Sequence, residues 1–483
     1  MNINNESPGT VSGNESPAYK VVETNEGVED GQYKCPKCGA TCIELDAGVG
    51  ALRCSFCRYE FNTERAVGLD TDISRLEGTI VGSGTQSIAT DAESIITLKC
   101  ASCGAEVVID TNESAQARCH WCRNTLSINQ QIPNGAVPDM VLPFRVIKED
   151  ARAEIHKFVN KRRFYAHPTF KQEFCTENIM GVYLPYMVVG KNTHAAFEGQ
   201  GERLVREYTI DDTRYYDADL YNVAREFDLV IEGLTIISSA DKLDRSSGRT
   251  NNIVNAIKPF DNENSVRWNA NYLKGFASEK RDTNIEDLKH SVDIKAKDIA
   301  RHAANKTLTG YDRGVRWYKE NLSVKGQQWK SAYLPIWLYS YQQVKSGGRN
   351  LLHYVAVNAR TKKTMGSVPV NKLRLFAVSS IIQILSTIAA LLSLGFIDEG
   401  GEYGLILLAA GVLYYLYVYG KYRNTGARFK HEEDTKTVMD NIKGSDVFVK
   451  RLKMLDSPKI AGVNNENVYY DVTKNRNPTR NVW

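Results

Sequence analysis

The chain has 483 residues, of which 42% are hydrophobic and 24% are charged, and its formal net charge is +4. That length allows roughly three domains of about 150 residues each, and the composition is that of a globular protein with a sizeable core. The small net charge gives no electrostatic indication of a nucleic-acid-binding protein, and the N-terminal stretch before Gly31 contains no apolar run that would predict a signal peptide.

The N-terminal quarter divides into polar stretches and two cysteine modules. Residues 1–33 are rich in Asn, Glu, Ser and Gly. They bury too little apolar surface to offset the entropy of folding, so we predict that they are disordered. A cysteine module follows at 34–61, and the polar stretch at 62–96 is typical of a flexible linker. The second cysteine module spans 97–125.

Each cysteine module contains two CxxC pairs, and the second module repeats the first, so that Cys100 corresponds to Cys35. Fifteen residues separate the inner cysteines in both modules. Two such turns bring four thiolates to one tetrahedral point, at about 2.3 Å per Zn–S bond, and this spacing is the pattern of a four-cysteine zinc site. The predicted ligands are Cys35, Cys38, Cys54 and Cys57 in the first module and Cys100, Cys103, Cys119 and Cys122 in the second. We therefore expect two Zn2+ ions per chain.

The metal is expected to be structural, because four thiolates leave no open coordination position for catalysis. Its binding stabilises each small module by on the order of 10–16 kcal/mol. Iron in a similar cage remains an alternative, whereas a reducing cytoplasm disfavours disulfides. Cys42 and His120 lie outside the two ligand sets, and Cys175 is expected to be a small buried hydrophobic residue.

Residues 126–370 mix helical and strand patterns, so we predict an α+β cytoplasmic domain. Amphipathic helices are predicted at 149–163 and 284–306, and strands at 182–189, 228–237, 332–342 and 352–358. The string Tyr-Leu-Pro occurs at 183–185 and again at 333–335, which we interpret as a weak repeat marking equivalent strands of two related halves. Since proline cannot donate a ladder hydrogen bond, each copy is expected at a strand edge or bulge.

The cysteine modules resemble the zinc ribbons of the transcription factor IIB type, and the whole chain resembles a bacterial family of membrane-anchored zinc-ribbon proteins. Beyond the cysteines, the resemblance rests on Tyr183-Leu184-Pro185, on Tyr333-Leu334-Pro335-Ile336-Trp337, and on the segment from Val357-Asn358-Ala359-Arg360-Thr361 to Gly366-Ser367-Val368-Pro369. Members of that family are often labelled primosomal or replication-restart helicase-like. The resemblance implies partners among band-7 and phage-shock-type membrane-stress proteins.

Two apolar segments near the C-terminus predict a two-helix transmembrane hairpin. Residues 375–397 are uncharged and as a helix span about 34 Å, enough to cross a hydrocarbon core of about 30 Å. Residues 404–420 lie at the short end of the spanning range. The loop between the segments is acidic and the outer flanks are basic, so the positive-inside rule predicts a multi-pass protein of the inner membrane with both termini in the cytoplasm. A buried helical hairpin in a soluble core is the alternative.

The C-terminal tail at 421–483 carries 13 Lys and Arg against 8 Asp and Glu. Cations close to a membrane attract anionic lipid at about 1 kcal/mol each. We therefore expect either a tail that contacts the cytoplasmic leaflet or a solvated, partly disordered segment.

The motifs predict a binding protein, since neither a GxxxxGK[ST] phosphate loop nor an HExxH zinc motif is present. The first module (34–58) has four cations against two acids and the second (99–123) three against three, whereas a nucleic-acid-binding surface with about 6–10 phosphate contacts needs more cations. Phe56, Tyr59 and Trp121 are expected to cover the metal cages, although such rings can also stack on bases.

We therefore expect a membrane-tethered adaptor or scaffold that holds other membrane or membrane-associated proteins at the cytoplasmic face. One alternative is a membrane-bound nucleic-acid-binding protein of replication or transcription. The other is an enzyme in domain 126–370.

Overall fold

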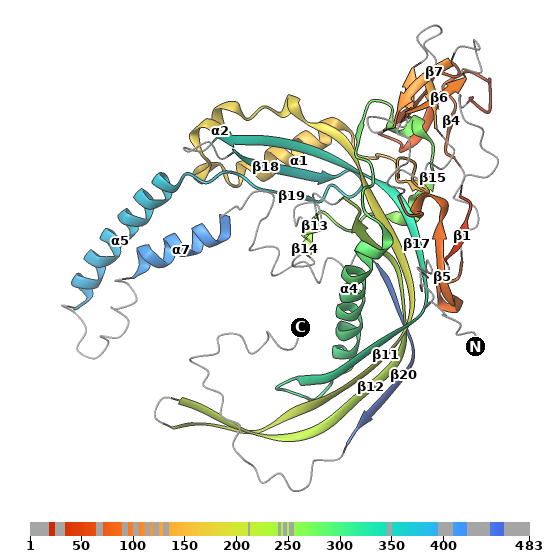
Figure 1. Ribbon diagram of the computed structural model, residues 1–483. Helices are drawn as coiled ribbons and strands as arrows, with labels where there is room; N and C mark the ends of the chain where they lie inside the picture. Colours follow the sequence, from red (N-terminus) through yellow and green to blue (C-terminus); the bar gives the residue numbers. More distant parts are fainter. Residues whose placement is uncertain are drawn as a thin grey trace, which may run out of the picture.

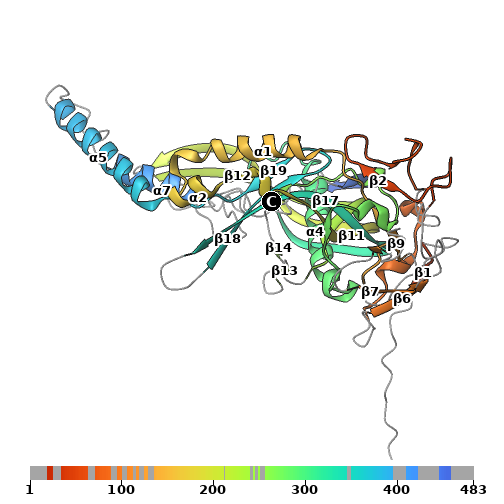
Figure 2. The ribbon, with the colours of Figure 1, turned by 90° about the horizontal axis from the view of Figure 1, so that it is seen from above.

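The structure is a computed structural model and shows a multi-domain α+β protein. It describes residues 19–24, 34–63, 71–88, 95–99, 106–111, 116–118, 125–128, 135–210, 213–239, 243–244, 249–250, 256–344, 350–394, 409–422 and 445–457. A curved sheet forms the body, the cysteine modules lie at one end of it, and the helices α5 (Lys372–Leu394) and α7 (Ala410–Tyr422) project from the other (Figures 1 and 2).

Four long strands set the shape of the sheet: β11 (Met180–Ile210), β12 (Thr213–Ile237), β17 (Val315–Val344) and β20 (Asp446–Asp456). With two shorter strands they run in the order β1-β5-β17-β11-β12-β20. The other described strands are β1 (Lys20–Val22), β2 (Ile43–Asp46), β3 (Ala51–Cys54), β4 (Glu60–Phe61), β5 (Gly78–Gly82), β6 (Ile95–Lys99), β7 (Glu106–Asp110), β8 (Gln116–Arg118), β9 (Thr125–Ser127), β10 (Met140–Val141), β13 (Leu243–Asp244), β14 (Arg249–Thr250), β15 (Val266–Arg267), β16 (Ala277–Ser278), β18 (Asn350–Asn358) and β19 (Thr364–Gly366).

The helices occupy different places around the sheet: α1 (Lys148–Asn160) packs near β18 and β19, and α5 and α7 project from the body. Besides α5 and α7, the described helices are η1 (Ile73–Arg75), η2 (Ser83–Thr85), α1 (Lys148–Asn160), η3 (Arg163–Tyr165), α2 (Pro168–Glu173), η4 (Thr176–Asn178), η6 (Asn262–Asn264), η7 (Ala270–Leu273) and α4 (Ile285–Asn305). The predicted helices at 149–163 and 284–306 correspond to α1 and α4. Helix α4 lies in the hollow of the curved sheet (Figure 1). Its buried residues Leu288, Val292 and Ile299 pack against Phe197 and Trp329 of the strands, because their spacing places them on one helix face.

The two Tyr-Leu-Pro copies lie side by side on β11 and β17. The antiparallel register pairs Tyr183 with Pro335, Leu184 with Leu334, and Pro185 with Tyr333. Strand β10 comes shortly before α1 and β11, and β16 comes shortly before α4 and β17. Each short strand pairs with the long strand of the other half: β10 pairs in parallel with β17, and β16 pairs in parallel with β11. Each half thus contributes a short strand, a helix and a long strand, and the two long strands occupy equivalent central positions, as the repeat predicted.

Each proline of the repeat sits where a neighbouring strand ends. Beside Pro185, the pairing of β12 stops at Tyr186, and that of β16 stops at Tyr183. Beside Pro335, the pairing of β10 stops at Tyr333 and that of β18 stops at Ile336. Neither proline therefore breaks a ladder on that side. The expected strand edge or bulge is wrong, because both prolines lie inside the long central strands β11 and β17, in regular register.

The segment predicted as a flexible linker, 62–96, contributes a strand to the sheet. Its strand β5 pairs with β17 and with β1, so the segment 1–33 also contains ordered structure. The next turn, η2, is buried, and the carboxylate of Asp139 accepts hydrogen bonds from the backbone N–H of Gly84 at 2.6 Å and from Thr24 at 2.8 Å. These two polar segments are ordered by strand pairing with distant parts of the chain and by hydrogen bonds to a buried carboxylate. Neither interaction requires an apolar periodicity in the sequence, so the order of these segments could not be predicted from it.

The tail predicted at 421–483 also contains a strand of the main sheet. Its strand β20 runs antiparallel to β12, and the buried guanidinium of Arg225 on β12 forms an ion pair with Asp456 at its end. The described part of the tail, 445–457, is therefore ordered on the protein body. The remainder of the tail beyond α7 lies outside the described residues.

Helix α5 is the single described helix that is long and apolar enough to cross a membrane. Its apolar window, Lys372–Leu391, has a mean hydropathy of 1.7, and 17% of it is buried. The second predicted span, 404–420, is described from residue 409 onward, and the 13 residues of α7 cover about 20 Å, short of a bilayer core of about 30 Å. The predicted two-helix hairpin and multi-pass placement are thus not supported by the described residues. The two helices nevertheless pack closely, because Gly411 donates its backbone N–H to Gln383 at 3.0 Å.

Candidate metal centre and acidic cleft

The four cysteines of the first module converge on one point. Their Sγ atoms all lie within 4.8 Å of one another, with Cys35 and Cys57 at 3.6 Å and Cys38 and Cys54 at 3.7 Å. A tetrahedron with Zn–S bonds of about 2.3 Å has edges of about 3.8 Å. The described cluster therefore has the size and the donor set to hold a metal ion such as zinc.

Two matched turns aim these thiols. The backbone N–H of Gly39 donates to Cys35 at 2.8 Å, and that of Arg58 donates to Cys54 at 2.9 Å. Both turns end in the left-handed region, at φ 73° for Gly39 and 58° for Arg58, where glycine is the less strained residue. The backbone N–H groups of Cys57 and Phe56 lower the pKa of Cys54 to about 7, which favours the thiolate that binds metals.

The first module is docked on the body of the protein. Ile43 and Leu52 of its hairpin are fully buried in the main core cluster, and Glu44 forms an ion pair with Lys274 at 2.9 Å. After the hairpin, Thr63 donates to the backbone of Arg267 at 2.7 Å. The first module is therefore fixed to the body, because its apolar face completes the core.

The second module is described only in its strands. Strand β6 pairs with β7, and β8 pairs with β9. Leu98, Ile109, Leu126 and Ile128 are buried in the same core cluster as the first module. The predicted ligands Cys100, Cys103, Cys119 and Cys122, together with His120 and Trp121, lie outside the described residues. One four-cysteine cluster is therefore shown, and the second remains a prediction.

The aromatic residue between two ligands points into solvent. Phe56 is 81% exposed, so the expectation that it covers the metal cage is wrong. Tyr59 stacks on Phe61 at 6.0 Å between ring centroids, and the Lys37 ammonium lies 5.7 Å from the Tyr59 ring. The surface of the module thus presents the exposed Phe56 ring and, separately, the Tyr59 ring with the Lys37 ammonium beside it. The two remaining described thiols, Cys42 and Cys175, are exposed, so Cys175 is not the buried residue that was expected.

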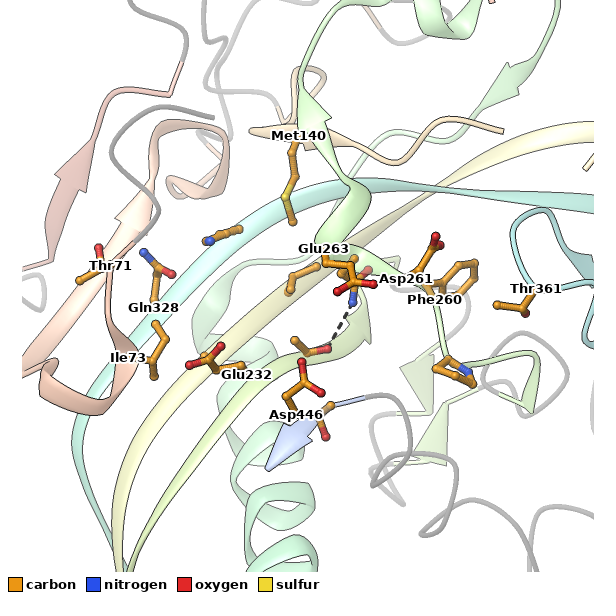
Figure 3. Close-up of a pocket in the computed structure, with 17 residues that line it drawn as sticks. Thr71, Ile73, Met140, Glu232, Phe260, Asp261, Glu263, Gln328, Thr361 and Asp446 are labelled. Atoms are coloured by element: carbon orange, nitrogen blue, oxygen red, sulfur yellow. Dashed lines mark hydrogen bonds between the residues drawn. The ribbon is translucent and has the colours of Figure 1, made fainter. Parts of the chain in front are cut away.

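An acidic cleft of about 460 Å³ opens on the sheet (Figure 3). Its carboxylates are Glu232 on β12, Asp261 and Glu263 on the chain entering and forming η6, and Asp446 at the start of β20. Asp261 is neutralised by Arg360 at 2.6 Å. No sequence pattern indicates this cleft, because its lining comes from segments as distant as Thr71 and Asp446 and carries no motif.

Comparison with known proteins places one distant relative beside this chain. The uncharacterized protein YdjG of Bacillus subtilis (strain 168) is 22% identical over 340 residues, which cover 70% of this chain and 90% of that protein. No family model and no solved structure matches the chain. The resemblance to membrane-anchored zinc-ribbon proteins is therefore supported by a four-cysteine cluster and by one distant relative.

Proposed function

We propose that this chain is a membrane-tethered adaptor that holds a protein complex at the cytoplasmic face of the membrane. The observation that carries the proposal is the placement of two features at opposite ends of the molecule. The metal module with its exposed Phe56 lies at one end, and the apolar helix α5 projects from the other (Figures 1 and 2).

The metal module is suited to recognition. Four thiolates saturate a zinc ion, so the metal offers no site for a substrate. Its role is to fix the turn that carries Phe56. A large aromatic ring held on a rigid turn loses little conformational entropy on binding and is typical of the residues that dominate protein interfaces. By the repeat in sequence, we propose a second zinc site at Cys100, Cys103, Cys119 and Cys122.

Charge favours a protein partner over nucleic acid. Of the cations in the first module, Arg53 is already held by Asp46 at 3.3 Å and Glu60 at 3.9 Å. Fewer cations than the sequence count are then free for phosphates, and binding to nucleic acid depends on about one cation per phosphate neutralised. The exposed Phe56 ring on the same module as Lys37 is the feature that keeps base stacking as the second candidate.

The pairing of β20 with β12 constrains the proposed membrane tether. Strand β20 follows the helices in sequence and pairs with β12, which precedes them. Both strands belong to one sheet, so the chain before α5 and the chain after α7 must lie on the same side of a bilayer. If α5 crosses, a second crossing or re-entry within 395–444 follows. We propose that the 404–420 segment makes it and that both termini are cytoplasmic.

The partners we propose are other membrane or membrane-associated proteins. The resemblance described above points to membrane-stress proteins of the band-7 and phage-shock types. A soluble partner recruited to the tether is compatible with the same geometry, because the first cysteine module lies at the opposite end of the body from α5 (Figures 1 and 2).

A pair of aromatic substitutions tests the recognition surface. The full chain is purified from gently solubilised membranes as wild type, Phe56→Ala and Tyr318→Ala, the last being a control ring on β17 that is 65% exposed. We expect Phe56→Ala alone to lose the co-purifying partner by at least tenfold, as for an interface residue worth about 2 kcal/mol, while zinc content stays unchanged. Partner retention in Phe56→Ala would contradict the proposed surface.

A nucleic-acid titration and reporter fusions test the remaining claims. Micromolar binding of mixed oligonucleotides by the full chain would replace the adaptor by the second candidate, if the logarithm of the affinity falls with the logarithm of the salt concentration by roughly 0.9 per phosphate neutralised.

Reporter fusions test the topology. Reporters at residues 1 and 483 should behave as cytoplasmic and a reporter in 398–403 as external. An external C-terminus would refute the return crossing.

A further inference from the structure

Cations from separate parts of the chain lie near the first turn of α5. The Arg374 guanidinium lies over the ring of Phe164 and the Lys372 ammonium over that of Tyr419. Arg162 and Lys421 both lie over the ring of Tyr422. We call these cations the α5 basic patch: Arg162, Arg163, Lys171, Lys372, Arg374 and Lys421. Two of the stretches that carry them, 366–394 and 409–422, contain no Asp or Glu, whereas Glu154 and Glu173 flank the third, 155–172. The patch includes residues of the sheet domain as well as the flanks of the apolar segments, so it is larger than the flanking charges alone suggest.

Backbone hydrogen bonds fix the η3 corner against the start of α5. His167 donates its N–H to Pro369 at 2.8 Å, and Asn371 donates its N–H to Tyr165 at 2.7 Å. The fully buried Leu375 packs in the same small cluster as Tyr165. The corner is therefore held beside the first turn of α5. The side chains of η3 consequently lie at a fixed position along the axis of that helix.

Three cations of the patch, Arg163, Lys171 and Arg374, are crowded together. Burial lowers the pKa of Lys171, and the positive charges of Arg374 and Arg163 lower it further. Within the described part of the chain, no carboxylate lies within ion-pair distance of these three side chains. Like charges gathered in this way repel one another, and a bound anion removes that repulsion.

Aromatic and apolar side chains border the patch on the side of α5. The Arg374 guanidinium lies 4.3 Å from the ring centroid of Phe164, and that ring is 53% exposed. One turn of α5 also exposes Leu373 at 83% and Phe376 at 65%. Aromatic rings at the end of an apolar helix are typical of the boundary between headgroups and hydrocarbon, and the cations lie at that level.

We propose that the α5 basic patch binds the phosphate groups of anionic phospholipids, with Arg163, Lys171 and Arg374 as the contacting side chains. Guanidinium groups suit this role because they donate two parallel hydrogen bonds to one phosphate. A lipid is the occupant rather than free phosphate, because the exposed Leu373 and Phe376 beside the cations require hydrocarbon. The inference rests on the proposed membrane tether, since α5 must lie in a bilayer for its neighbours to meet headgroups.

Hydrogen exchange of the full chain in lipid nanodiscs tests the proposal. The discs contain phosphatidylcholine alone or with increasing phosphatidylglycerol, and exchange is followed by mass spectrometry. Bound headgroups stabilise the corner, so peptides covering 161–174 should exchange more slowly as phosphatidylglycerol rises. In Arg163→Glu the phosphatidylglycerol fraction needed for half of the protection should rise at least about fivefold, from the attraction of one cation to an anionic surface. Arg163→Lys should keep most of the protection.

Four outcomes distinguish a lipid headgroup site from a general charge effect, a free-phosphate site and the absence of a membrane tether. The matched control Lys289→Glu, a reversal on the exposed side of α4, should leave the protection unchanged, and an equal loss there would reduce the effect to general charge. Equal protection of 161–174 in both disc types, with 376–391 protected, would overturn the headgroup site and leave the tether intact. Full protection by soluble glycerol phosphate in phosphatidylcholine discs would reassign the patch to free phosphate. Rapid exchange of 376–391 in every disc would instead refute the tether itself.

Discussion

Asp139 is the side chain whose loss should most clearly loosen the connection between the two cysteine modules. It is fully buried. Its carboxylate accepts four hydrogen bonds, from the backbone N–H of Gly84 and of Ser331, both at 2.6 Å, and from the hydroxyls of Thr24 at 2.8 Å and Thr85 at 3.0 Å. The donors come from β17, from the turn after β5 and from the residues after β1, so one carboxylate joins three segments.

The cost of replacing Asp139 follows from which donors can find another acceptor. Thr85 already reaches the carbonyl of Gly82 at 2.9 Å, so its hydroxyl can adapt, whereas the two backbone N–H groups cannot turn away. A buried N–H left without an acceptor costs about 1–3 kcal/mol. Asp139→Ala leaves both N–H groups unpaired and should cost about 4 kcal/mol, and Asp139→Asn leaves one unpaired and should cost about 2 kcal/mol.

Local hydrogen exchange measures this cost without assuming that the whole chain unfolds in one step. Amides of 78–85 should exchange about 30-fold faster in Asp139→Asn and about a thousandfold faster in Asp139→Ala, at about 1.4 kcal/mol per tenfold change. Asp312→Ala, at an exposed carboxylate, is the matched control and should change nothing. Equal effects of the Asn and Ala variants would refute the reasoning, because they would show that water replaces the carboxylate.

Three further predictions concern the metal and the outer strands. The full chain should contain two equivalents of zinc by elemental analysis, and Cys54→Ser should reduce this to one; a wild-type ratio near one would remove the argument from the repeat. Arg225→Met removes charged hydrogen bonds to Asp456, each worth about 1.5–3 kcal/mol. Amide hydrogen exchange across 446–456 should therefore become at least tenfold faster, and an unchanged rate would show that backbone pairing alone holds β20. The hydrogen bond from Lys325 lowers the pKa of Asp228 from 3.8, so the stabilisation is present at neutral pH and is lost as the pH falls through that lowered value. Asp228→Asn should therefore flatten the acid decline of the thermal unfolding midpoint, and an unchanged decline would count against this ion pair.

The parts of the fold that follow local rules could be predicted from the sequence. The spacing of Cys35, Cys38, Cys54 and Cys57 is set by the geometry of a tetrahedral site, and the structure brings these four together. Helices α1 and α4 begin and end close to the predicted bounds, because each has one apolar face. The apolar centres of β11, β12, β17 and β18 could be predicted because each is a short run of aromatic and β-branched residues.

The parts that depend on distant partners could not be predicted. The outer half of β11 alternates buried and half-buried positions from Thr193 to Gly201, a pattern weaker than the apolar run before it. Strand β5 is short, and its pairing partner on β17, Gly326 to Trp329, lies far along the chain. Strand β20 carries exposed apolar residues on both faces, such as the neighbours Phe448 and Val449, so its sequence lacks the alternation that marks a half-buried strand.

The pairing of β20 with β12 also sets an order of events during synthesis. Strand β12 ends at Ile237 and β20 ends at Asp456, so everything between these two positions is translated before the outer edge of β12 is covered. At about 5–20 residues per second this takes on the order of ten seconds or more, during which a long strand edge is open to wrong pairing. Both apolar segments emerge from the ribosome within that interval. If the proposed tether crosses the membrane and returns, a chain whose C-terminal segment remains on the far side cannot supply β20, and its sheet stays incomplete. Under that proposal, closure of the strand edge depends on correct insertion, and chaperones or proteases that recognise open strand edges would act selectively on the chains that failed.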